Sequence, residues 1–475
     1  MRWDTVIGLE VHAELLTKSK IFCGCTAEFG GEPNSRVCPI CSGMPGTLPK
    51  LNRAVVEHAV RVGLALECTI LKQCKFDRKN YFYPDLPKAY QVSQLYSPIC
   101  RDGHMDIIAG GQKKRIGIRE IHMEEDAGKL IHSDGETYMD FNRCGVPLLE
   151  IVTLPDFRNV VEVHNFLDKL RETLLYLGVC DCKMQEGSLR VDVNLSIRPA
   201  GCDSPLGTRT ETKNLNSLKA IGRAIEFEQR RQIELLESGG EVVQETRRWV
   251  DDIAKSFALR SKENSPDYRY FPEPDLLPID IDEQCMAHIK KTLPELAHQK
   301  RERFTRDYAL SEKEAAALTN HKKISDLFEA VSELSKEPRE AAHLFTGEIM
   351  RLMKNTNTLP EVLDLDTGKL ARLVSYVSKG KINRSAYKET VEAVFLHDAD
   401  PELYITEHGL LMFGDAAAVT EAAKAVLSEY PEAAADYRAG KEKAFGFLMG
   451  KTMTTLGGNG NPDIVRRILK KTLDK

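Results

Sequence analysis

The sequence lacks any apolar run approaching about 18 residues, so it predicts no membrane-spanning helix. Its first residues, Trp3 to Ile7, show neither the basic, apolar and small-residue succession of a signal peptide nor an amphipathic presequence. Basic residues are not in excess either, because 66 Lys and Arg stand against 71 Asp and Glu and leave a net charge of −5. We therefore expect a cytoplasmic protein without a membrane partner, in which nucleic acid could bind only a local patch.

A disulfide framework is also not expected, although the chain has twelve cysteines. Four of them form two short pairs in a loop rich in Gly and Pro: Cys23 with Cys25, and Cys38 with Cys41. Each pair can hold one edge of a tetrahedron, so the spacing predicts a structural Zn²⁺ site. Because all four corners are cysteine, the site has no open position for a substrate. Free thiols are the alternative.

At 475 residues the chain is too long for one hydrophobic core, and its length suggests about three domains. Alternating, strand-like patterns dominate up to Pro278, and helical periodicity dominates from Leu293 onward. The first part also holds three amphipathic helices, predicted over Asn52 to Glu67, Asn159 to Leu177 and Leu218 to Ser238. We place domain boundaries near residues 293 and 405.

The stretch from Ile118 to Lys129 carries an unusual density of polar groups for a strand. The period of two puts His122 and Glu124 on one face and Met123 and Glu125 on the other. Neighbouring carboxylates repel each other unless a cation or a donor lies between them, which favours a divalent metal with oxygen and imidazole ligands. A solvated, charged strand end is the alternative. Strand parity alone does not choose between Glu124 and Glu125.

Two further strand patterns offer metal-competent side chains. From Val6 to Leu16 the alternation places Glu10, His12 and Glu14 on one face, although a sheet with one hydrated face gives the same pattern. Glu150 lies inside an apolar run, where a carboxylate must be paired, ligated or neutralised. Glu150 is therefore a strong ligand candidate.

Cationic and polar surfaces suited to a phosphorylated ligand follow elsewhere. The aromatic and proline-rich run from Phe76 to Gln91 holds Arg78, Lys79 and Lys88, and it suits a phosphate or a nucleotide base unless it is simply packed on the sheet. The strands Glu186 to Arg198 and Thr208 to Asn214 are expected to pair. Their polar faces form either a wall for such a ligand or a hydrated sheet face.

The segment from Arg438 to Lys475 contrasts with the acidic remainder of the chain. It holds nine Lys and Arg against three Asp and Glu, a local charge of +6. This pattern predicts contact with an RNA backbone, and a basic helix that meets a partner protein is the alternative.

Taken together, six motifs closely resemble one family, the GatB family of tRNA-dependent amidotransferase components. They are Gly8 to His12, the four cysteines, Lys79 to Asp85, His122 to Lys129, Asp267 to Asp275 and Lys443 to Lys451. The resemblance covers essentially the full length. The amidase signature Gly-Gly-Ser-Ser-Gly-Gly is absent, so the chain is not expected to make its own ammonia.

The resemblance implies an α+β fold with an antiparallel-sheet catalytic cradle, then an all-helical domain, then a small helical tail domain. We expect these domains at residues 1–293, 294–405 and 406–475, with tRNA bound by the tail. It also implies a heterotrimer in which the two partners are an amidase (glutaminase) subunit, GatA, and a small third subunit, GatC. The presence of the four cysteines favours the zinc-bearing branch of the family.

The implied reaction makes Gln-tRNA(Gln) or Asn-tRNA(Asn) from the mischarged precursor. ATP phosphorylates the side-chain carboxylate, and ammonia then attacks the acyl phosphate. From the resemblance we expect Mg²⁺ on His12, Glu125 and Glu150, with Glu125 taken in preference to Glu124. The resemblance further implies that Lys79 and Arg190 contact phosphate. It also implies that Tyr81, Tyr83, Asp192 and Glu211 shape the pocket, and that Glu10 and Glu124 are catalytic carboxylates near the metal.

Two other functions remain open at this point. One is a non-catalytic tRNA-binding scaffold, which would bind tRNA without ATP turnover. The other is a stand-alone metal-dependent ligase that joins ammonia to a small carboxylic acid, which would act without tRNA or partner subunits. The sequence does not choose between Glu-tRNA(Gln) and Asp-tRNA(Asn) as substrates.

Overall fold

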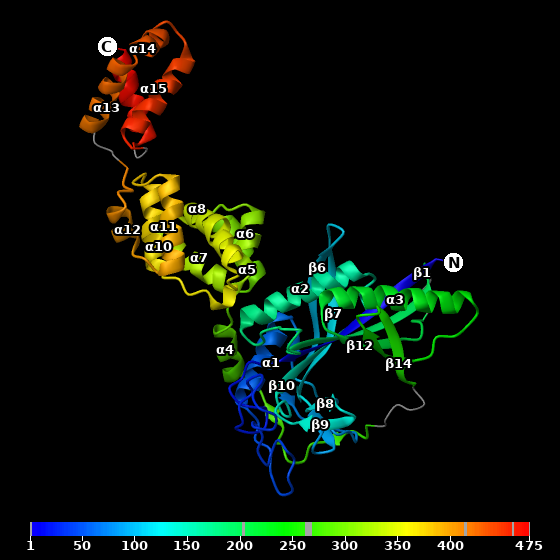
Figure 1. Cartoon of the computed structure of the whole chain (residues 1–475). Helices are drawn as coiled ribbons and strands as arrows, with labels where there is room; N and C mark the ends of the chain where they lie inside the picture. The colour runs from blue at the N-terminus through cyan, green and yellow to red at the C-terminus, as the bar shows by residue number, and fades with distance from the viewer. Residues whose placement is uncertain (1, 202–204, 262–267, 413–415, 458–459, 475) are drawn as a thin grey trace. The chain divides into compact units, whose positions relative to one another are not determined.

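The computed structural model describes residues 2–201, 205–261, 268–412, 416–457 and 460–474 (Figure 1). The chain divides into two compact units, Met1–Leu296 and Ala297–Lys475, each with its own architecture. Asp267, the first residue of one family motif, lies outside the described residues.

A nine-stranded sheet forms the centre of the first unit. Its strands are hydrogen-bonded in the order β14-β13-β12-β11-β1-β10-β7-β6-β2. Neighbouring strands run antiparallel, except that β12 and β13 are parallel. In the same order the bounds are Lys255–Ser261, Glu245–Val250, Thr210–Leu215, Leu189–Pro199, Trp3–Glu14, Pro147–Thr153, Gln112–Glu125, Cys100–Ala109 and Thr69–Ile70.

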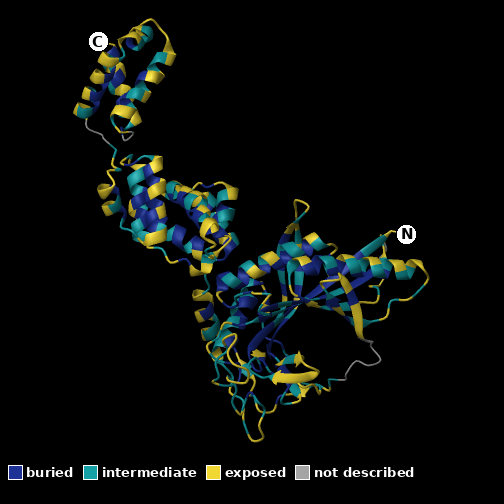
Figure 2. Ribbon diagram, in the orientation of Figure 1, coloured by how far each residue is buried: buried dark blue, intermediate teal, exposed yellow. Residues whose placement is uncertain are grey.

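The two faces of this sheet differ in character. Three helices cover one face: α1 (Arg53–Ala65), α2 (Val160–Leu177) and α3 (Leu218–Glu237). Their N-cap residues are Asn52, Asn159 and Ser217, respectively. The core of the unit lies between sheet and helices, as the buried residues in Figure 2 show. The expected alternation is confirmed, because Ile7, Leu9 and Val11 point into this core while Glu10 and His12 point to the other face.

Smaller elements border the open face. A three-stranded sheet, β15-β4-β5, joins Phe271–Pro272, Asp77–Asn80 and Tyr90–Ser93. The pair β3 (Gln73–Cys74) and β16 (Ile279–Asp280) and the hairpin β8 (Lys129–Ser133) and β9 (Glu136–Asp140) complete the strands, and α4 (Glu283–Lys291) follows. The β4–β15 pairing brings two aromatic runs, far apart in sequence, into contact.

The second unit is helical throughout its described residues. Two separate hydrophobic cores form within it, one from Phe304 to Ile405 and one from Ala423 to Leu473. Across the described residues, every helix is too short or too polar to cross a membrane. The elements are α5 (Ala297–Asp307), α6 (Glu312–Thr319), α7 (Lys322–Ser335), α8 (Pro338–His343), the π-helix η2 (Leu344–Ile349), α9 (Met350–Thr356), η3 (Pro360–Val362), α10 (Thr367–Ser378), α11 (Arg384–His397), α12 (Pro401–Glu407), α13 (Ala416–Glu429), α14 (Pro431–Arg438), α15 (Glu442–Thr455) and α16 (Pro462–Leu473).

Candidate active site

A row of polar side chains crosses the open face of the sheet. The register aligns His12 of β1 with Glu150 of β10, and Glu150 in turn with His122 of β7. Residues directly opposite on antiparallel strands point to the same face, so the three side chains lie side by side. Glu124 follows His122 by two positions and therefore shares that face.

His12, Glu124 and Glu150 form the tightest cluster in this row. One potential ligand atom from each lies within 4.8 Å of the other two, and His12 Nε2 is 3.5 Å from Glu124 Oε1. Glu124 is buried, and burial together with the charge of Glu150 raises its pKa. Burial opposes ionisation of Glu150 as well, but His12 and His122 outweigh it and lower the pKa of Glu150. One buried carboxyl, one partly buried carboxyl and an imidazole therefore share a space in which a cation would relieve the repulsion.

Glu125 does not join this cluster. Its side chain points to the opposite face of β7, where Lys88 Nζ lies 2.5 Å from Glu125 Oε1 and the Val92 amide donates to the same oxygen at 2.9 Å. The expectation that Glu125 completes a set with His12 and Glu150 therefore does not match the geometry, which places Glu124 there. The physical reason is strand parity, because only every second residue of β7 can face His12.

A second acidic cluster lies beside the first one. Ligand atoms of Glu10, Asp192 and Glu211 lie within 4.8 Å of one another. Lys213 Nζ lies 2.5 Å from Asp192 Oδ2 and 2.8 Å from Glu211 Oε1, and Asn194 donates to Glu10 at 2.9 Å. Burial would lower the pKa of Lys213, but Asp192 and Glu211 outweigh it and raise the pKa. This cluster thus carries its own permanent cation.

Lys79 and a group of tyrosines border the row from the small sheet. Lys79 Nζ lies 5.0 Å from the centre of the Tyr268 ring, and Tyr81 meets Tyr268 edge to face at 5.9 Å. Burial would lower the pKa of Lys79, but Glu124 and Tyr270 outweigh it and raise the pKa, so the side chain stays cationic. The position suits an ammonium group that meets an anionic ligand above the carboxylates.

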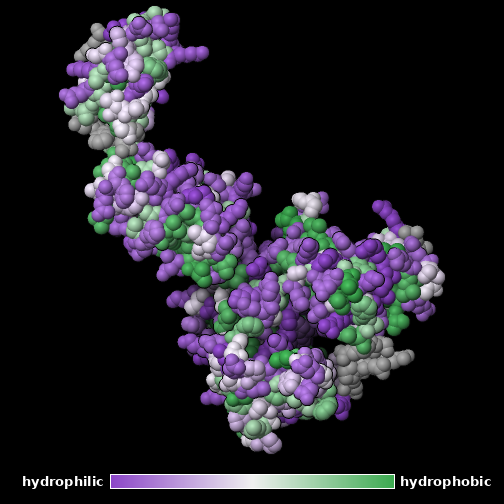
Figure 3. All heavy atoms as spheres, in the orientation of Figure 1, coloured by the Kyte–Doolittle hydropathy of each residue, from purple (hydrophilic) through white to green (hydrophobic). Residues whose placement is uncertain are grey.

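These groups surround a cavity of about 430 Å³. In Figure 3 the first unit is hollowed on the visible face, with mostly hydrophilic residues at the back of the hollow. Five of the predicted site residues line the cavity: Glu10, His12, Lys79, Glu150 and Glu211. The remaining lining residues are Asn194, Arg209, Lys213, Gln244, Glu245, Thr246, Tyr268 and Tyr270.

The other six predicted residues lie outside that lining: Glu124, Glu125 and Asp192, described above, and Arg190, Tyr81 and Tyr83. Arg190 faces the same side of the sheet as His12, but its Nη2 is bound to Asp126 Oδ2 at 2.8 Å. Beside it, burial and the negative charge of Asp126 raise the pKa of Glu14 to about 8. Tyr81 contacts Tyr268 from behind the lining, and Tyr83 lies half exposed on the loop after β4. The contact that Arg190 makes in the structure is therefore with Asp126, on the side of the sheet that carries His12.

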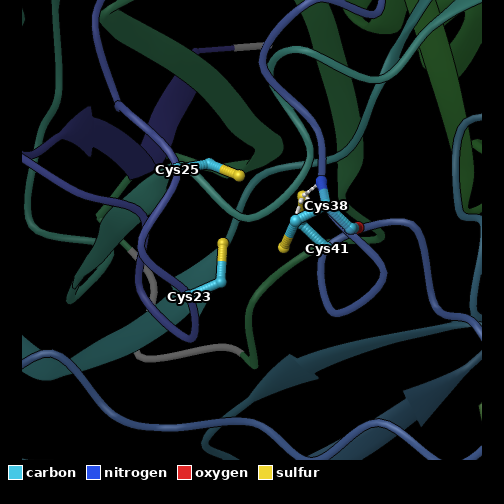
Figure 4. A group of neighbouring side chains, drawn as sticks. All are labelled: Cys23, Cys25, Cys38 and Cys41. Carbon is cyan, nitrogen blue, oxygen red and sulfur yellow. Dashed lines mark hydrogen bonds between the residues drawn. The ribbon is translucent and has the colours of Figure 1, made fainter.

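The four cysteines of the early loop converge at a separate place in the first unit. Their sulfur atoms lie within 4.8 Å of one another and point toward a common centre (Figure 4). A tetrahedral zinc with bonds of about 2.3 Å separates its sulfur ligands by roughly 3.8 Å, and Cys38 Sγ and Cys41 Sγ are 3.9 Å apart. A hydrogen bond from the Cys23 thiol lowers the pKa of Cys41 to about 4 against the effect of burial. The donor atoms and their spacing make this cluster a candidate metal-binding site.

Several residues of these sites were not predicted as site residues from the sequence. Tyr268 and Tyr270 reach the cavity only because β15 pairs with β4, and the similar composition of the two aromatic runs was the one available signal. Lys213 and Asn194 were expected on a polar wall without a specific role. Lys20, which is buried beside the cysteines, gave no signal because a single lysine before an apolar pair is an ordinary pattern.

Two family models match the chain. A GatB/GatE catalytic domain matches residues 5–287, and a GatB domain matches residues 326–473. Among curated proteins, the chain is 55% identical to the B subunit of the aspartyl/glutamyl-tRNA(Asn/Gln) amidotransferase of Lachnoclostridium phytofermentans, over 100% of this chain and 99% of the relative. Proteins with the same name from Caldicellulosiruptor bescii and Lachnospira eligens are 52% and 51% identical, with at least 99% of both chains covered in each case.

Proposed function

Since the chain belongs to the GatB family, we propose that it carries the activating step of tRNA-dependent amidation. The family comprises the B subunits of aspartyl/glutamyl-tRNA(Asn/Gln) amidotransferases, which are ligase-type amidation complexes. In the activating step ATP phosphorylates the side-chain carboxylate of Glu-tRNA(Gln), Asp-tRNA(Asn) or both. Ammonia from a partner glutaminase then displaces the phosphate. The observation that carries the proposal is the pairing of two acidic clusters with Lys79 around one polar cavity.

The chemistry explains why such a cavity is needed. A carboxylate oxygen is a poor leaving group, so the carboxyl must become an acyl phosphate before an amine can replace it. Phosphoryl transfer depends mostly on positioning and on stabilising charge on the phosphate oxygens. Lys79, buried among carboxylates and rings, supplies a fixed cation at the cavity wall.

We propose that His12, Glu124 and Glu150 hold Mg²⁺. The donor set fits because such an ion accepts carboxylate oxygens together with one imidazole. In addition, neither carboxyl has a lysine or arginine partner among the ion pairs of the described residues. When bound, the ion would neutralise charge on the phosphate oxygens of ATP.

The other predicted residues take supporting roles in this proposal. Glu10 on β1 and Glu211 on β12 line the cavity, and Asp192 on β11 lies beside them and holds Lys213, which also contacts Glu211. Tyr81 backs Tyr268 and so shapes the entrance toward Lys79, and Tyr83 offers an exposed ring on the same loop. Arg190 holds Asp126 and meets phosphate only if a ligand draws it from that pair.

The cysteine cluster is proposed to hold structural Zn²⁺. Four sulfur ligands leave no position for a substrate, so the ion would fasten the loop from Cys23 to Cys41 and take no part in the reaction. The fit rests on the convergence of the four sulfur atoms and on the separation of Cys38 Sγ from Cys41 Sγ.

We further propose three functional parts with the boundaries expected from the sequence, 1–293, 294–405 and 406–475. The last part would bind the mischarged tRNA through the nine lysines and arginines between Arg438 and Lys475, several of which lie on α15 and α16. An amidase (glutaminase) subunit, GatA, and the small subunit GatC would complete a heterotrimer, because the described cavity supplies acids and cations for activation but the sequence carries no amidase signature.

One assay tests the proposed reaction. The complex is reconstituted with each mischarged tRNA, ATP and glutamine, and formation of ADP and of amidated aminoacyl-tRNA is followed with and without the amidase. With the amidase omitted, free ammonia should support amidation and ATP turnover should still require the mischarged tRNA. Binding of tRNA without any ATP turnover would identify a scaffold instead, and amidation of a free amino acid without tRNA would identify a stand-alone ligase.

A further inference from the structure

Lys20 is a fully buried lysine beside the cysteine cluster, with 0% of its surface exposed. Its Nζ donates to Arg36 O at 2.8 Å and lies 3.5 Å from Phe141 O and 3.6 Å from Cys41 Sγ. A buried ammonium group needs hydrogen-bond acceptors and also a compensating negative charge. In the described part of the chain its polar contacts are two neutral carbonyls and the sulfur of Cys41, so Cys41 is the contact that can supply the compensating charge.

Two other cations near this loop already have carboxylate partners. Arg36 lies 3.7 Å from a carboxylate oxygen of Glu28, and Lys88 is paired with Glu125. Lys20 differs from both, because among the described residues the group within its hydrogen-bonding reach that can carry negative charge is a sulfur ligand of the candidate metal site.

We propose that Lys20 is the built-in counter-charge of the four-cysteine site. The inference rests on the proposed zinc site. Four thiolates around a divalent ion leave a net charge of −2 in a largely buried place, and the ammonium group of Lys20 halves that excess. Lys20 is thus a positioning residue of the metal site, although it binds no metal itself.

The same side chain fastens the cysteine loop to the base of the β8–β9 hairpin. Lys20 reaches Phe141 O, while Asn34 bonds to Met139 O and the Phe141 amide, and the Arg36 amide donates to Asn142 Oδ1. Directly after this base, the Gly145 amide donates to Asp126 O, and Asp126 holds Arg190. One ammonium group therefore contributes both to charge balance at the sulfur cluster and, together with Asn34 and the Arg36 amide, to the attachment of the loop to this hairpin.

Zinc affinity of the full-length chain, copurified with its partner subunits, tests the proposal. Lys20→Gln keeps a donor for the Arg36 carbonyl but removes the charge, Lys20→Arg keeps the charge, and the exposed Lys18→Gln serves as a matched control on the same loop. Competition with a chelating dye should show zinc bound about 10- to 100-fold more weakly by Lys20→Gln. Lys20→Arg should lose less, and Lys18→Gln should match the parent. With Co²⁺ in place of zinc, the sulfur-to-cobalt absorption should weaken in the same order.

A second measurement needs no variant and therefore does not depend on the folding of Lys20→Gln. The parent protein is treated with an amine-acylating reagent before and after removal of its metal, and the modified lysines are identified by mass spectrometry. Lys20 should be protected in the metal-loaded protein and become reactive when the metal is removed, while Lys18 reacts equally in both.

The outcomes separate this inference from the one beneath it. Zinc affinity unchanged by Lys20→Gln, or Lys20 reactivity unchanged by metal removal, would overturn the role of Lys20 and leave the metal site standing. A parent protein that takes up neither zinc nor cobalt would overturn the metal site itself.

Discussion

Glu124 and Glu125 are adjacent in sequence, yet the structure predicts opposite consequences for their replacement by glutamine. Glu124→Gln removes one of two carboxylates from the cluster with His12 and Glu150. Removing one partner of a buried charge pair costs about 3 to 5 kcal/mol. Applied to bound Mg²⁺, this corresponds to a dissociation constant raised by roughly two to four orders of magnitude.

The same substitution should not lower the folding stability of the first unit. Burial and Glu150 raise the pKa of Glu124, which means that its charged form is disfavoured in the absence of a cation. Glutamine removes that repulsion and retains the size of the side chain. We therefore expect a melting temperature equal to or above that of the parent in metal-free buffer.

Glu125→Gln should do the reverse. Lys88 would lose its partner at 2.5 Å, with side-chain exposures of 16% for Lys88 and 6% for Glu125, so the cost of about 3 kcal/mol falls on folding. For a unit of this size that cost lowers the melting temperature by roughly 5 to 10 °C. The Mg²⁺ concentration that half-saturates phosphorylation should not change.

The assay measures transfer of labelled phosphate from ATP to the mischarged tRNA across a Mg²⁺ titration, together with thermal melts of each variant. Glu57→Gln serves as the control because Glu57 is a partly exposed residue of α1. Asp77→Asn is unsuitable because the Asp77 carboxylate accepts two backbone hydrogen bonds. A Glu125→Gln protein with an unchanged melting temperature and a raised Mg²⁺ requirement would refute the reasoning, as would full phosphorylation by Glu124→Gln at low Mg²⁺.

Three further predictions concern other parts of the chain. The pKa of Glu14 is raised to about 8, so the folded state keeps a proton that the unfolded state releases near the ordinary pKa of 4.5, and stability is lost as pH rises from about 5 to 8. Glu14→Gln cannot titrate at this position and should show a flatter dependence of melting temperature on pH over that range. An unchanged slope would contradict the assignment. Lys79→Met should lower phosphorylation by about 10²- to 10³-fold while tRNA binding persists, with the exposed Lys72→Met as the matched control, and equal effects of the two would remove Lys79 from the site. Replacing both Arg466 and Arg467 of α16 by alanine should weaken tRNA binding without changing the melting temperature. The slope of log affinity against log salt should fall by the amount that corresponds to about two phosphate contacts. An unaltered slope would place the RNA elsewhere.

The sequence was sufficient for local structure wherever a single period decides the outcome. The faces of β1, β7 and β11, the pairing of β11 with β12, and the helices that follow Asn52, Asn159 and Ser217 all agree with the structure. The faces and the helices follow from alternation, capping or helical spacing within one segment, and the β11–β12 pairing joins two alternating segments that are neighbours in sequence.

The candidate site was predicted less completely because its assembly depends on register between strands. Parity gives two faces for β7 but does not say which face meets His12, and only the alignment of His12, Glu150 and His122 decides that Glu124 is the neighbour. The partner of Glu125 is likewise a long-range contact, since Lys88 arrives on the loop before β5. Tyr268 was missed for the same reason, because it reaches the cavity through the pairing of β15 with β4.

The sheet also separates the polar cavity on its open face from the packed side that holds Lys88, and consecutive carboxylates of β7 point to different sides. A substitution changes one side at a time, but deletion of a single residue between the β6–β7 turn and His122 would shift every later residue of β7 by one position. Glu125 would then face His12, Asp126 would take its place beside Lys88, and Glu124 would move to the buried position of Met123. The length of this strand is therefore under a stricter requirement than the identity of most residues within it. Libraries that vary side chains along β7 should yield many folded proteins, whereas libraries that vary its length by one should yield almost none.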